Sequence, residues 1–140
     1  MANTTVNKTV IKRFVDECLN KKNLEALHEL VMEDFMEQVP FPGQGPGREG
    51  LRVTLVGFHQ AFADSHWTLQ EQIAEGDTVV SRFTMTGTHR GEFLGIPATG
   101  RPVNVWGVVI DVVRGGKMVG SRILMDTLGL MQQLGVIPGP

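Results

Sequence analysis

The sequence contains little of what disulfide-bonded or membrane-spanning proteins require. It has one cysteine, Cys18, among 140 residues, so no disulfide can form within the chain. No apolar run approaches the ~20 residues that span a bilayer, and the first ten residues lack the apolar segment of a signal peptide. We therefore expect a cytoplasmic protein that has no membrane partner.

The sequence also lacks an excess of positive charge and the spacings of common cofactor sites. Its 13 Lys and Arg residues face 15 Asp and Glu residues, for a net charge of -2, so we expect no nucleic-acid partner. No two of its four histidines have metal-site spacing near a carboxylate. Neither a GxSxG elbow nor a P-loop is present. We expect no metal and no cofactor.

Hydrophobic residues make up 41% of the chain, enough for one domain over residues 1–140 with a buried core. Apolar residues at helical spacing predict three helices in the first half, at residues 5–20, 24–31 and 51–62. Asn23 is placed to cap the second helix. Residues 43–49 are rich in glycine and proline and predict a loop.

The second half changes to a period of two, which is typical of β-strands. Strands are expected at residues 67–73, 78–86, 103–113 and 118–125, with a Gly-Gly hairpin between the last two. A short helix follows before the tail at 136–140, and Asp126 is placed to cap it. Helices followed by a meander of strands predict an α+β fold, in which a curved antiparallel sheet packs on three N-terminal helices.

Three stretches together resemble one known family. They are EGDTVVSRFTMTGTH at residues 75–89, the loop GTHRGEFLGIPATGRPV at 87–103, and DTLGLMQQLG at 126–135 after the GGK hairpin. They are similar to the SnoaL-like polyketide cyclases, also called ester cyclases, of the nuclear-transport-factor-2-like superfamily. The resemblance implies a cone-shaped fold around an apolar pocket and commonly a homodimer. It also implies metal-free acid/base chemistry on polyketide, terpenoid or steroid-like substrates.

The resemblance also implies where a site would lie, on the inward face of the last two strands. Val109 stands where the aldol-type cyclases carry a histidine, and Ile123 where the cyclases carry an aspartate. Phe14 replaces the tyrosine of the ketosteroid isomerases. Arg82 matches an arginine of the limonene epoxide hydrolases that orients an acid. The usual acid and base of the family are thus absent from this sequence.

Asp111 is the leading candidate for a catalytic group. It lies in VVIDVV, on the same side of its strand as Val109, and burial among apolar residues should raise its pKa. We expect it to act as an acid or base, with Arg82 as its partner. The alternative is a structural ion pair with Arg82 or Arg122.

Eight further side chains are expected to bind the substrate: Phe14, Trp67, Thr84, His89, Val109, Ser121, Ile123 and Met125. For His89, a hydrogen bond that stabilises its loop is an equally good interpretation.

Two functions are consistent with these predictions. The first is a cofactor-free enzyme that isomerises, cyclises, dehydrates or hydrolyses a small apolar molecule. The second is a non-catalytic dimeric protein that binds an apolar ligand. In either case Trp106, Val108, Ile110 and Val112 form an apolar stripe on the outer face of the sheet, and this stripe predicts a homodimer.

Overall fold

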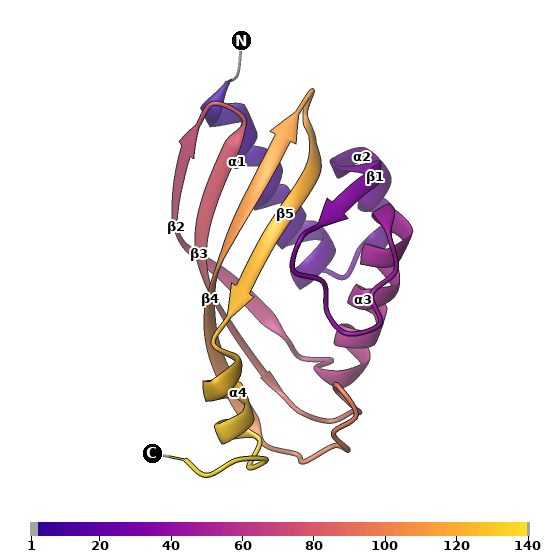
Figure 1. Ribbon diagram of the computed structural model, residues 1–140, viewed down its shortest axis with the longest axis vertical. Coiled ribbons are helices and arrows are strands. Elements are labelled where there is room, and N and C mark those ends of the chain that lie inside the picture. Colours follow the sequence, from indigo (N-terminus) through magenta and orange to yellow (C-terminus); the bar gives the residue numbers. More distant parts are fainter. Residues whose placement is uncertain (1–2, 140) are drawn as a thin grey trace.

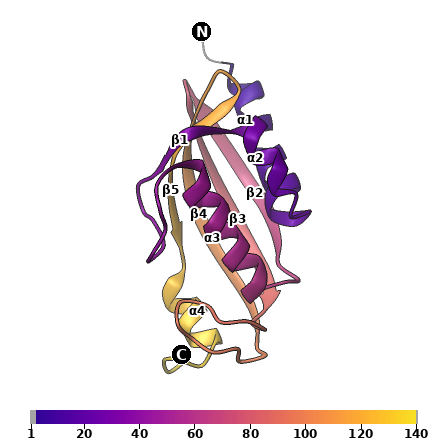
Figure 2. The same ribbon diagram turned by 90° about the vertical axis from the view of Figure 1, so that its right-hand side faces the viewer.

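A five-stranded β-sheet with helices α1 and α3 on one face forms the frame of the molecule (Figure 1, Figure 2). The computed structural model describes residues 3–139. Its elements are, in chain order, α1 (Thr4–Arg13), η1 (Phe14–Asn20), η2 (Leu24–Ala26), α2 (Leu27–Leu30), β1 (Val31–Glu37), α3 (Gly47–Ala61), β2 (His66–Glu75), β3 (Thr78–Thr88), β4 (Pro102–Arg114), β5 (Lys117–Met125) and α4 (Thr127–Gln133). The predicted α+β fold is confirmed.

The strands lie in the order β1-β5-β4-β3-β2, and every neighbouring pair except β1 with β5 is antiparallel. The parallel strand β1 corrects the prediction of a purely antiparallel sheet. Its sequence, VMEDFME, has three consecutive exposed residues after Val31, so it lacks the alternation that identifies a half-buried strand. β1 lies at the edge of the sheet, so its backbone pairs with a neighbouring strand, β5, on one side only.

The first predicted helix is present, but its second half is wound more widely. Asn3 caps α1 by accepting a hydrogen bond from the backbone N–H of Val6. The helix then continues over Phe14–Asn20 with π-helical hydrogen bonding. Cys18 lies in this π-helical part and is fully buried.

The second predicted helix is shorter than expected. A 3₁₀ turn precedes the single α-helical turn of α2, and β1 begins at Val31. The Asn23 side chain makes no capping hydrogen bond, which corrects the predicted cap.

The third helix begins inside the predicted 43–49 loop, at Gly47, and ends at Ala61. The loop folds back on the first helical turn so closely that a Cβ atom at Gly50 would overlap the carbonyl oxygen of Gly45. The glycines therefore permit a tight loop-to-helix contact, and the loop is shorter than its composition predicted.

The C-terminal elements follow their sequence signals. Gly115 and Gly116 have φ of 58° and 78°, the positive values that a two-residue hairpin of type I′ needs. Asp126 caps α4 by accepting a hydrogen bond of 3.0 Å from the backbone N–H of Gly129. Both predictions are confirmed. Among the described residues 3–139, no helix is long and apolar enough to cross a membrane.

The core lies between the helices and the inward face of the sheet. In β4 the inward positions include Val103, Val105, Asp111 and Val113, all of which are buried. On the outward face, Trp106 remains 52% exposed. The outward face of this strand is therefore uncovered in the single chain.

Candidate functional site

A cavity of about 100 Å³ lies between the helices and the inward face of the sheet. Its wall is mostly apolar, with side chains from α1, η1, α3 and all five strands. Six of the residues predicted for the site line it: Phe14, Trp67, Val109, Asp111, Ser121 and Ile123.

Asp111 brings a carboxyl group to the wall of this cavity. The residue is 2% exposed, and its Oδ1 atom has no hydrogen-bond partner within residues 3–139. Burial raises the pKa of Asp111 to about 7. Hydrogen bonding with the Ser121 side chain lowers this pKa, and the negative charge of Glu37 raises it. An uncharged carboxyl that can donate a proton is therefore available near neutral pH.

Glu37, at the end of β1, supplies a second carboxyl group to the same cavity. Its Oε2 atom accepts hydrogen bonds from the backbone N–H groups of Val39, at 2.9 Å, and Ile123, at 3.4 Å. In the sheet, Glu37 pairs with Ser121, and Ser121 pairs with Asp111 across the next strand. The three residues thus form one row across β1, β5 and β4.

Sequence reasoning missed Glu37 because it missed β1. A carboxyl in a stretch without strand periodicity has no predicted face, and its pairing with β5 joins residues 84 positions apart.

Trp67 adds a hydrogen-bond donor to the cavity. Its ring packs against Phe83 and Phe58, with centroid separations of 5.0 and 5.4 Å. These contacts fix the position of the indole, and its Nε1–H group has no partner among residues 3–139. Buried tryptophan N–H groups usually have a hydrogen-bond partner. An oxygen atom of a bound ligand could therefore accept this hydrogen bond.

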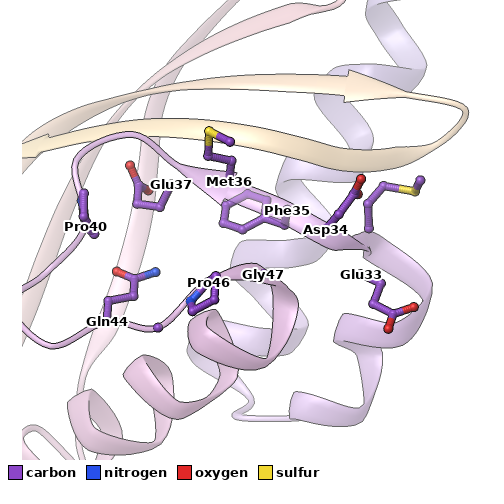
Figure 3. A pocket seen from close by; sticks show the side chains of 11 residues that line it. Glu33, Asp34, Phe35, Met36, Glu37, Pro40, Gln44, Pro46 and Gly47 are labelled. Carbon is purple, nitrogen blue, oxygen red and sulfur yellow. The ribbon is translucent and has the colours of Figure 1, made fainter.

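A larger groove of about 1000 Å³ adjoins the cavity between β1 and the loop that follows it. Figure 3 shows Phe35 and Glu37 on β1, with Gln44 and Pro46 on the loop that faces the strand. Three residues, Phe35, Glu37 and Gln44, line both the groove and the cavity. They mark the boundary at which a ligand in the groove would meet the cavity.

Arg82 is not the partner of Asp111. Its Nε atom donates a hydrogen bond of 2.8 Å to Glu71, and both side chains are substantially exposed. Arg82 pairs in the sheet with Val108, whereas Asp111 pairs with Val79, so the arginine lies on the opposite face. The predicted partnership is wrong, because the side chains of Arg82 and Asp111 lie on opposite faces of the sheet.

The alternative ion pair with Arg122 is also absent. Arg122 pairs with Ile110 in the sheet and is exposed, so its side chain lies on the outer face. Among residues 3–139, Asp111 forms no salt bridge.

Three residues predicted to bind the substrate do not line the cavity: Thr84, Met125 and His89. Thr84 lies on the outer face, where its hydroxyl accepts a hydrogen bond of 3.0 Å from Gln70. Met125 lines a separate hollow beside α4. Thr84 lies on the outer face because successive side chains of a strand point to opposite faces of the sheet. Met125 lies beyond the cavity, at the end of β5.

His89 is fully buried in its loop instead of lining the cavity. Its Nδ1 atom accepts a hydrogen bond of 3.2 Å from the Thr99 N–H and lies 3.0 Å from the Thr99 hydroxyl. The ring also packs on Phe62. This is the loop-stabilising role that the sequence offered as the alternative.

The described part of the chain offers this site neither a group of three metal ligands nor a reactive cysteine. Within residues 3–139, no three His, Cys, Asp or Glu side chains come together in a group that could hold a metal ion. Burial raises the pKa of the Cys18 thiol to about 12, which disfavours the reactive thiolate.

Comparisons with known proteins agree with this architecture. The model of the SnoaL-like polyketide cyclase family matches residues 9–134, nearly the whole chain. The chain belongs to this family. A search of curated proteins finds no match.

Several solved structures resemble this SnoaL-like protein over almost its full length. TsrD from Streptomyces laurentii is 28% identical, with a TM-score of 0.89, covering 98% of this chain and 100% of TsrD. IdmH from Streptomyces antibioticus, a candidate polyketide cyclase, is 31% identical, with a TM-score of 0.80, covering 92% of this chain and 98% of IdmH. A candidate polyketide cyclase from Bacillus cereus is 26% identical, with a TM-score of 0.82, covering 95% of this chain and 83% of that protein.

Proposed function

We propose that this SnoaL-like protein is a cofactor-independent enzyme that transfers protons to or from a small apolar substrate, with Asp111 as a catalytic residue. The observation that carries the proposal is the buried Asp111 carboxyl on the wall of an apolar cavity, whose Oδ1 atom has no hydrogen-bond partner within residues 3–139. A buried carboxyl with an oxygen atom that has no partner is costly to stability, and a catalytic role accounts for that cost. Its pKa of about 7 suits a group that must both hold and release a proton at neutral pH.

The cavity limits the class of substrate. Its apolar wall favours a hydrocarbon skeleton, and its few polar groups favour one or two oxygen atoms on that skeleton. A polyketide, terpenoid or steroid-like molecule meets both requirements, and the description of IdmH as a candidate polyketide cyclase supports this class. Because the cavity is only about 100 Å³, a larger substrate would extend past Glu37 into the groove.

The chemistry follows from proton transfer without a cofactor. Cyclisation, isomerisation, dehydration and hydrolysis all need a proton removed from one atom and delivered to another. A specific observation favours the second function, a non-catalytic binding protein: apolar Val109 and Ile123 occupy the positions of the family's usual histidine and aspartate. These two functions differ in whether Asp111 is needed for turnover.

Deuterium uptake by a simple ketone can separate the two functions. The probe is 2-tetralone, a compact apolar ketone, whose α-hydrogens exchange with D2O at a rate that proton NMR can follow. We expect the protein to accelerate this exchange and Asp111→Asn to lose the acceleration by ~10² or more, the usual contribution of a positioned acid or base. Asp16→Asn, a change in a surface ion pair with Lys21, is the matched control and should keep the full rate.

A protein that binds 2-tetralone without accelerating exchange would support the binding function. Equal rates for Asp111→Asn and the parent protein would show that Asp111 takes no part in proton transfer.

A further inference from the structure

We propose that Glu37 is the base of this site and Asp111 its acid, and that the substrate is a carbonyl compound with an acidic hydrogen on the carbon next to the carbonyl group. This inference rests on the function proposed above and assigns a role to a residue that the sequence did not reveal. It comes from the arrangement of Glu37, Ser121 and Asp111 on three adjacent strands.

The geometry places the two carboxyls at a useful separation. Neighbouring strands lie ~4.8 Å apart, so two residues on the same row with one strand between them have backbones ~10 Å apart. Both side chains reach the cavity from their strands. In the proposed arrangement one carboxyl acts at the carbonyl oxygen of the substrate and the other at the neighbouring carbon.

The charges in the cavity favour different roles for the two carboxyls. Glu37 and Asp111 are the only titratable side chains among the residues that line it, and no Lys, Arg or His is present there. Two carboxylates in one apolar cavity repel each other, so one of them is favoured in the neutral form. Asp111 is the buried member, whereas Glu37 borders the groove and receives two backbone N–H hydrogen bonds. Asp111 therefore holds the proton and Glu37 carries the negative charge.

This division gives a complete first step for a carbonyl substrate. The C–H bond next to the carbonyl group breaks, and its proton goes to the Glu37 carboxylate. The electron pair of that bond forms a carbon–carbon double bond, and the negative charge moves to the carbonyl oxygen. Asp111 stabilises that oxygen by donating a hydrogen bond. The charge lost by Glu37 equals the charge gained by the substrate, so no other reactant is needed.

Trp67 supplies a further interaction for the same oxygen atom. Trp67 lines the cavity, its Nε1–H group is buried without a partner among residues 3–139, and this group cannot itself take up a proton. With no cation in the cavity, hydrogen bonds from neutral donors are the means of stabilising the developing negative charge. An enolisable carbonyl substrate makes use of both donors and of the carboxylate at the mouth.

The test is the deuterium uptake of 2-tetralone by variants of Glu37. Glu37→Gln keeps the size of the side chain and an oxygen atom that can accept the same backbone hydrogen bonds, so we expect it to fold. Exchange should fall by ~10² or more, because an amide cannot take up the proton. Glu75→Gln, the same change on an exposed strand residue outside both hollows, is the control and should keep the full rate.

A second variant distinguishes a catalytic loss from a structural one. Glu37→Ala leaves room at the boundary with the groove, and added acetate should restore part of its exchange rate, because a small carboxylate can replace the missing base. A misfolded protein would show no such rescue. Full activity in Glu37→Gln together with lost activity in Asp111→Asn would overturn the role of Glu37 and leave the function proposed for Asp111 intact. If Glu37→Ala unfolds at the same urea concentration as the parent protein, lost activity without rescue by acetate would also count against Glu37 as the base.

Discussion

At the scale of the residue, Asp111 couples the site to the stability of the fold. Its pKa is 3.8 in an unfolded chain and about 7 in the folded protein. Below pH 3.8 both states hold the proton, so ionisation of the group makes no contribution to stability. As the pH rises from 3.8 to 7, the unfolded state releases the proton and the folded state keeps it, so stability falls with pH over this window. The rise in pKa corresponds to ~4 kcal/mol, at 1.36 kcal/mol per pKa unit, and the full loss is reached above pH 7.

Asp111→Asn should remove this dependence. We expect the variant to unfold at the same denaturant concentration as the parent protein, or a lower one, at pH 4, and at a clearly higher one at pH 8. No described cation loses a partner, so the change carries no ion-pair penalty. Urea unfolding at both pH values measures the difference, with Asp16→Asn as the control. A variant that is less stable than the parent at pH 8 would contradict a buried Asp111 carboxyl whose pKa is raised by folding.

At the scale of the element, sequence patterns located the long helices and strands and failed at β1. The two-residue period of β2 to β5 and the cap formed by Asp126 depend on neighbouring residues, so a local pattern predicts them. Strand β1 exists because it pairs with β5, which lies more than 80 residues later. Its own sequence carries too few alternating residues to predict that pairing.

The same difference explains the candidate site. Asp111 could be predicted because its own strand is apolar and its side can be counted from Val109. Arg82 was assigned to the wrong face because the register between β3 and β4 was unknown. Glu37 was missed with its strand. The face of Asp111 could thus be predicted from its own strand, whereas the places of Arg82 and Glu37 depended on pairing between strands.

At the scale of the whole molecule, the sheet has one face covered by helices and one face open. On the open face Trp106 and Leu124 are 52% and 66% exposed, and Ile73 is 65% exposed. Exposed apolar side chains in such numbers favour a contact with another molecule. We propose that a second copy of the chain covers this face, because a two-fold pair would bury both apolar stripes at once.

Sedimentation equilibrium tests the homodimer. We expect the parent protein to sediment as a dimer at micromolar concentration and Trp106→Glu to sediment as a monomer, because a charge would be buried in the contact. Val53→Glu, at an exposed position of α3 on the other side of the molecule, should stay dimeric. A parent protein that is monomeric at this concentration would refute the dimer.

The titration of the Asp111 carboxyl measures the central claim most directly. Carbon-13 NMR of the aspartate carboxyl groups, with the Asp111 signal identified by its loss in Asp111→Asn, follows the protonation of this one group. We predict a midpoint at about pH 7 in the parent protein and a lower midpoint in Glu37→Gln, because the charge of Glu37 raises the pKa of Asp111. A midpoint near the ordinary value of 3.8 in the parent protein would mean that Asp111 is ionised at neutral pH. It would then not be the acid of this site.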